Sequence, residues 1–121
     1  MTQKQVIDAY KALTKLNTQP LPMKTAYALH KLRRALQPAW DFQVEQEGAL
    51  FDKLKPTPIG NGALQFKSPD ELKTWNQTID ELNAMPSDIE FAPVTVTMDD
   101  AISITPEDID RLEGFVIFEE G

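Results

Sequence analysis

The chain contains no cysteine, which excludes a disulfide framework, a thiolate metal site and a cysteine nucleophile. Histidine is nearly as scarce. His30 is the only one, and no carboxylate lies near it in the sequence to orient it as a general base. No serine lies in the G-x-S-x-G turn of a hydrolase nucleophile. We therefore predict a protein that is not an enzyme and that holds no cofactor.

Long apolar runs are also missing. No segment approaches the roughly 18 consecutive apolar residues of a membrane span, and the first ten residues lack the apolar stretch of a signal peptide. With 121 residues, 41% of them hydrophobic and 26% charged, the composition is typical of a globular protein. The length predicts one domain over residues 1–121. We expect a cytoplasmic location and no membrane partner.

Acidic residues are absent from one long stretch, between Asp8 and Asp41. That stretch contains the bases Lys11, Lys15, Lys24, Lys31, Arg33 and Arg34. Residues 1–60 carry nine Lys/Arg and five Asp/Glu, a net charge of +4, whereas residues 61–121 carry three and fourteen, a net of −11. Electric fields of opposite sign on one small protein determine which surfaces of a partner protein, or of a second copy, it can bind. Because the net charge is −7, nucleic acid is not an expected partner.

The spacing of apolar residues predicts helices in a first part of the chain, residues 1–55. One helix is predicted over residues 3–16, and a second begins at Pro22 or Met23. Its buried stripe continues past Pro38, which favours one long kinked helix over two separate ones. Helices joined by tight loops predict a helical hairpin or small bundle.

The rest of the chain predicts a mixed α/β part, residues 63–121, after a proline-rich and glycine-rich linker over residues 56–62. Two helices are expected to begin at a cap-proline-acid signature, at Ser68 and at Thr105. Strands are predicted where the apolar period changes to two or a short apolar run occurs. The predicted strands cover residues 63–66, 88–98 and 102–104, and residues 115–118 are either a final strand or a tail that docks on the core. The predicted class is α+β, with a small antiparallel sheet and one or two further helices.

An acidic cluster near the C-terminus is a candidate cation site, formed by Asp99, Asp100, Glu107, Asp108 and Asp110. It lacks the spacing and central glycine of an EF-hand loop. A turn explains its first two acids and a helix N-terminus the others. We therefore predict no metal ligand.

Two segments, residues 12–32 and residues 104–115, carry a family resemblance. The first holds Ala-Leu-Thr-Lys-Leu and, after a short loop, Leu-Pro-Met-Lys-Thr-Ala-Tyr-Ala-Leu-His-Lys-Leu; the second reads Ile-Thr-Pro-Glu-Asp-Ile-Asp-Arg-Leu-Glu-Gly-Phe. Together they resemble a family of small proteins of tailed phages and prophages that has no settled activity. The chain departs from that family at residues 55–62, where a more polar turn is expected. The resemblance implies a phage or prophage origin, hence the host cytoplasm, and no catalytic residues.

The leading hypothesis is a non-enzymatic protein-interaction module of phage type, acting in virion assembly or host takeover on a protein partner of unknown identity. One alternative is an acidic decoy that inhibits a host nucleic-acid-binding enzyme, and another is a nucleic-acid binder with a basic face. The opposite charges also fit a homodimer. The candidate interaction residues are Lys24, Lys31, Arg33, Arg34, Trp40, Trp75, Glu107, Asp108, Asp110, Phe115 and Phe118.

Overall fold

A computed structural model of the chain describes residues 1–98 and 102–120. Its elements in order are α1 (Gln3–Leu16), α2 (Met23–Leu54), β1 (Thr57–Gly60), β2 (Ala63–Gln65), α3 (Pro69–Ala84), β3 (Val94–Met98), α4 (Pro106–Arg111) and β4 (Val116–Glu120). The predicted α+β class is confirmed, with a helical first part, a small antiparallel sheet and further helices. The predicted acidic residues Asp99 and Asp100 lie outside the described residues.

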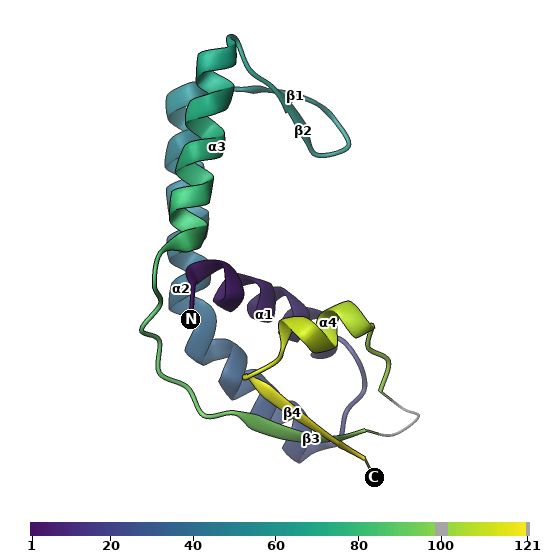
Figure 1. The fold of residues 1–121 in the computed structure, drawn as a ribbon. Helices are drawn as coiled ribbons and strands as arrows, with labels where there is room; N and C mark the ends of the chain where they lie inside the picture. Colours follow the sequence, from purple (N-terminus) through teal and green to yellow (C-terminus); the bar gives the residue numbers. More distant parts are fainter. Residues whose placement is uncertain (99–101, 121) are drawn as a thin grey trace.

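The molecule consists of a body and a projecting arm (Figure 1). The body contains α1, the first half of α2, α4 and the pair β3–β4. The second half of α2 and all of α3 run side by side away from it, and the hairpin β1–β2 lies at their far end. We call residues 43–84 the arm, and the hairpin with the start of α3 its tip.

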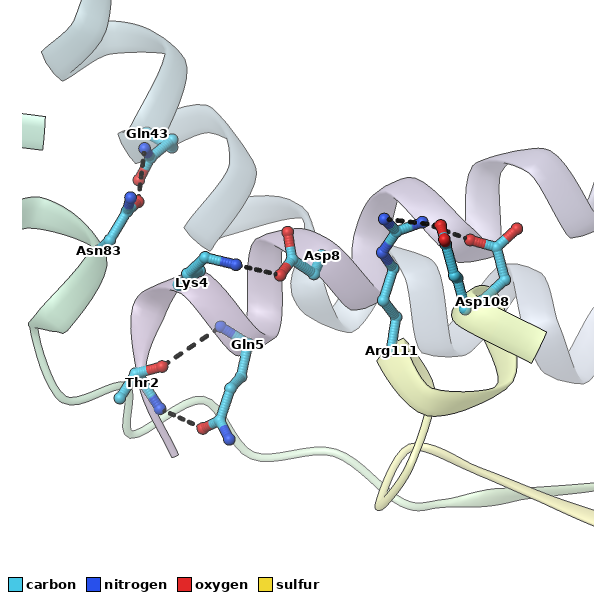
Figure 2. A network of polar contacts seen from close by, with 9 residues as sticks. Thr2, Lys4, Gln5, Asp8, Gln43, Asn83, Asp108 and Arg111 are labelled. Atoms are coloured by element: carbon cyan, nitrogen blue, oxygen red, sulfur yellow. Dashed lines mark hydrogen bonds and ion pairs between the residues drawn. The ribbon is translucent and has the colours of Figure 1, made fainter. Parts of the chain in front are cut away.

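The first helix begins with a reciprocal cap. The hydroxyl of Thr2 accepts a hydrogen bond from the Gln5 backbone N–H at 3.3 Å, and the Thr2 N–H donates to Gln5 Oε1 at 2.8 Å (Figure 2). Lys4 and Asp8 add an ion pair of 2.9 Å one turn apart. Thr2 also forms a β-bridge with Pro86, which fixes the start of α1 against the chain that leaves α3.

The second helix is continuous through Pro38, as predicted, and its direction changes along its length (Figure 1). Leu29, Leu32 and Leu36 form its buried stripe in the body. In the arm the buried side is carried by Leu50 and Leu54. A single helix therefore serves both parts of the molecule.

The segment predicted as a linker, residues 56–62, instead forms the first strand and the turn of an antiparallel hairpin with β2. Three consecutive residues at the turn, Gly60, Asn61 and Gly62, have positive φ angles of 95°, 55° and 74°. Glycine and asparagine reach this region at the lowest cost, so the same residues that suggest flexibility make a tight reversal.

The strands β3 and β4 pair in parallel, from Val94 opposite Val116 to Met98 opposite Glu120. The prediction of strands was right for residues 94–98 and for the last apolar run, but wrong for residues 88–91 and 102–104, which form no strand. A parallel pair needs a crossover connection, and α4 lies in that connection. The two-residue alternation of apolar side chains along one strand does not show which other strand will pair with it.

The core lies in the body, where α1 packs against α2 and α4, and α2 packs against β3. Two stacked aromatic pairs extend it. Tyr10 lies 4.8 Å from Trp40 and Phe91 lies 4.7 Å from Phe115, measured between ring centroids. The fully buried large side chains are Val6, Leu13, Leu16, Leu29, Leu36, Val96, Leu112 and Phe115.

Candidate interaction surfaces

Three acidic interaction residues were predicted. The prediction is wrong for Asp108, which is buried, with an exposed fraction of only 5%. Its carboxylate accepts a hydrogen bond from Arg111 Nη1 at 2.8 Å (Figure 2). The same carboxylate lies 3.7 Å from Lys15 Nζ. Thr105 caps the helix by accepting from the Asp108 backbone N–H. Asp108 therefore joins α4 to α1, whereas Glu107 and Asp110 remain exposed.

Burial alone would raise the pKa of the Asp108 carboxyl, but the hydrogen bond from Arg111 and the charge of Lys15 outweigh burial, so that its pKa is lowered. The same hydrogen bond raises the pKa of Arg111. A carboxyl with a lowered pKa in the folded state stabilises the fold when it is ionised. This contribution is complete above the ordinary pKa of 3.8 and is lost as the pH falls through the lowered value.

We expect Asp108→Asn to lower the free energy of unfolding by about 1–3 kcal/mol at pH 7. The difference from the unmodified protein should shrink towards zero in acid, since protonation removes the same charge. Urea titrations from pH 7 down to about pH 2 measure it. Glu107→Gln is the matched control, because that exposed side chain should change stability by less than about 0.5 kcal/mol. A gap that persists unchanged in acid would contradict the ionic role.

The predicted aromatic residues do not gather on one surface. The prediction is wrong for Phe115, which is 1% exposed and stacked on Phe91. It belongs to the core, because β4 begins directly after it against the body. Phe118 packs against the same core, and Trp40 stacks on Tyr10 at the base of the arm. Trp75 is half-buried near the tip, its ring 5.6 Å from that of Phe66.

The predicted basic residues all belong to the first half of α2. Lys24, Lys31 and Arg34 are exposed, whereas Arg33 is half-buried, with its guanidinium 6.0 Å from the Tyr10 ring centroid. None of the four is in an ion pair within the part of the chain that the structure describes. This basic surface is therefore available to an anionic partner.

The tip of the arm is a surface that the sequence analysis missed. A hollow of about 510 Å³ lies between the hairpin and the start of α3, and its apolar lining includes Ile59, Leu64, Phe66 and Leu72. Ile59 is 60% exposed and Leu72 is 44% exposed. No charged residue occurs from position 56 to position 66 in a chain that is 26% charged. That absence of charge was the available signal, but residues 56–62 were interpreted as a linker because of their prolines and glycines.

A polar network fixes the base of the arm to the body. The side chain of Gln3, buried between α1 and α2, donates to the backbone oxygen of Ala39 at 2.9 Å. Gln43 is also buried and donates to Glu47 at 2.9 Å. It also donates to Asn83 at 3.5 Å (Figure 2). Buried amides with several partners specify geometry, so these bonds orient α2 and α3 relative to α1.

Two further properties concern the described residues only. Over residues 1–98 and 102–120, no helix is both long enough and apolar enough to cross a bilayer. Over the same residues, no group of three acidic or histidine side chains is placed to hold a metal ion.

In the comparisons with known proteins, no protein-family model, no curated protein and no solved structure matches the chain.

Proposed function

We propose that this chain is a non-enzymatic protein-interaction module that docks a partner protein at the tip of its arm. The observation that carries the proposal is the exposed, mainly apolar hollow at the end of a projecting helical pair. Exposed apolar patches with a concave centre favour protein contacts, since a few buried anchor side chains supply most of the binding energy.

The residues that line the tip indicate which side chains of a partner would fit there. The hollow is lined mainly by Ile59, Leu64, Phe66 and Leu72, so it fits an apolar anchor side chain. The only charged residue that lines it is Lys67, which favours an acidic residue beside that anchor. A two-stranded hairpin is marginally stable alone, so contact with a partner would also stabilise β1 and β2.

The phage or prophage setting, and a role in virion assembly or host takeover, are part of this proposal and depend on the resemblance of residues 12–32 and 104–115. The two alternatives also remain hypotheses. The nucleic-acid binder with a basic face remains a candidate for one reason. Among the described residues no ion pair involves Lys24, Lys31 or Arg34, and all three are exposed. An acidic decoy would have to act through exposed acids other than Asp108.

Ile59→Glu and Leu72→Glu test the tip. Each places a charge in the apolar hollow, so we expect each to reduce the binding of a captured partner by at least about tenfold. Tagged protein is incubated with a host-cell lysate, captured proteins are identified by mass spectrometry, and binding of each is then titrated. Met23→Glu is the matched control, because Met23 is an exposed apolar residue at the opposite end of α2.

Circular dichroism should show no change in any of the three variants, since all three side chains are exposed. A partner that binds both tip variants as tightly as the unmodified chain would refute docking at the tip.

A further inference from the structure

An exposed stripe runs along the whole length of α2. Its residues recur at alternating spacings of four and three, which place them on one side of a helix. Leu32 and Leu36, which face the core, lie on the opposite side of the same helix. All residues of the stripe are exposed: Tyr27, Lys31, Arg34, Pro38, Asp41, Glu45, Gly48 and Asp52.

Charge is sorted along α2, with Pro38 at the boundary. Before it the helix contains four bases and no acid: Lys24, Lys31, Arg33 and Arg34. After it the helix contains one base, Lys53, and four acids: Asp41, Glu45, Glu47 and Asp52. The two halves therefore have net charges of +4 and −3. Over its 32 residues, about 48 Å of helical rise, α2 therefore has oppositely charged halves on either side of Pro38.

The stability of the single chain does not explain this sorting. Lys24 lies in the first turn and Asp52 in the last, where each opposes the helix dipole. Among the described residues, no ion pair involves Lys31, Arg34 or Asp41, nor Glu45 at the next turn of the stripe. Within the chain Lys31 Nζ lies 5.5 Å from the Tyr27 ring centroid, but the separation of bases from acids gives the helix no ion pair among these described residues, and this points to a contact outside the chain.

A glycine in the stripe gives a second, independent observation. Gly48 lies inside α2, where glycine is less stable than alanine. A Cβ atom at this position would meet nothing within 4 Å, so nothing in the single chain requires glycine there. Ala49, its neighbour, is also small and exposed. The acidic half of α2 thus has two adjacent positions without a long side chain, Gly48 and Ala49. We call them the shallow site, because a large side chain of another molecule can lie over them.

We propose that two copies of this chain associate through α2, with the helices antiparallel and the two-fold axis near Pro38. Lys31 and Glu45 each lie seven residues from Pro38, and Lys24 and Asp52 each lie fourteen residues from it. In this register Lys31 and Lys24 of one copy face Glu45 and Asp52 of the other, and symmetry makes each of these two pairs twice. The contact goes beyond the proposed function, because it uses a different surface from the tip.

The aromatic residues of the stripe and its flank fit the same register. Tyr27, 64% exposed, lies eleven residues before Pro38, and Ala49 lies eleven after it, so the ring covers the shallow site of the second copy. Arg34 lies four residues before Pro38 and Phe42 four after it, which brings a guanidinium over an exposed ring. The occupant is a second copy because the surface is complementary to itself.

Single cysteines test the register directly, since the chain has none of its own. A mixture of Lys31→Cys and Glu45→Cys proteins should form a disulfide-linked dimer under mild oxidation, because these positions face each other. Each variant alone should link slowly, because the two copies of residue 31 lie about 21 Å apart along the axis. Lys73→Cys mixed with Glu45→Cys is the control, since Lys73 lies on α3.

Charge reversal tests the energetics. Lys31→Glu and Glu45→Lys should each raise the dissociation constant of the dimer at least about tenfold, and the double variant should restore it to within about threefold. Sedimentation velocity at low salt measures the constants, and raising the salt should weaken the unmodified dimer. Lys73→Glu and Glu81→Lys are the matched controls, because these exposed residues lie on α3.

A chain that is monomeric at hundreds of micromolar in low salt would overturn the proposal. So would a double variant that is no better than the two single variants, or cross-linking of Lys31→Cys protein with itself as fast as in the mixture. Partner binding at the tip can persist in any of these cases, so failure of the dimer and failure of the proposed function are distinguishable.

Discussion

Phe115→Ala is expected to lower the free energy of unfolding by about 3–5 kcal/mol. Phe115 is the largest fully buried side chain of the body, and its ring stacks on Phe91 at 4.7 Å. It follows Gly114, whose φ of 86° turns the chain from α4 into β4. Alanine would leave a cavity where α4, β4 and the residues before β3 meet, and close packing allows only partial collapse of such a cavity.

Urea unfolding followed by circular dichroism measures this loss. Phe42→Ala is the matched control, since it removes the same atoms from a side chain that is 39% exposed on α2. We expect the control to cost roughly 1 kcal/mol or less in the monomer. Equal costs for the two variants would mean that Phe115 is not in the core.

Amide hydrogen exchange is expected to be at least about 100-fold slower in α1 than in α3. Residues of α1 that face the core include Val6, Ala9 and Leu13, none of which has exposed surface. In α3 only Leu82 is buried, near the base of the arm. Helices with few buried apolar contacts open without unfolding the rest, so the arm should exchange through local opening.

Exchange measured by mass spectrometry at fixed pH resolves the two helices. The protected amides of α3 should lie towards Leu82, where Gln43 donates to Asn83 and joins α2 to α3. Gln43→Ala should speed exchange in α3 and leave α1 within about threefold of its original rate. Uniform protection of both helices would instead show that body and arm unfold as one unit.

Local signals predicted the helices well, because capping and periodicity are properties of neighbouring residues. Ser68 and Thr105 cap their helices as the sequence indicates, each by accepting a backbone hydrogen bond three residues on. The uninterrupted course of α2 through Pro38 was also predicted, since the apolar stripe continues past it. These features need no knowledge of distant parts of the chain.

The interaction residues were less well predicted, because their exposure depends on what packs against them. Phe115 and Asp108 resemble surface anchors in the sequence but are buried between α4, α1 and the strands. Conversely, residues 56–62 were interpreted as a linker but form, together with β2, the exposed hairpin at the tip. An uncharged, proline-rich segment predicts either outcome until its neighbours are known.

The sequence by itself determined the α+β class, the starts of the helices and the sorting of charge along α2, since each follows from the order and spacing of residues. Only the tertiary structure decided that β3 and β4 are parallel, that Asp108 is internal, and that the apolar hairpin lies at the end of an arm. Those properties arise from contacts between residues far apart in the chain, and local residue preferences do not contain them.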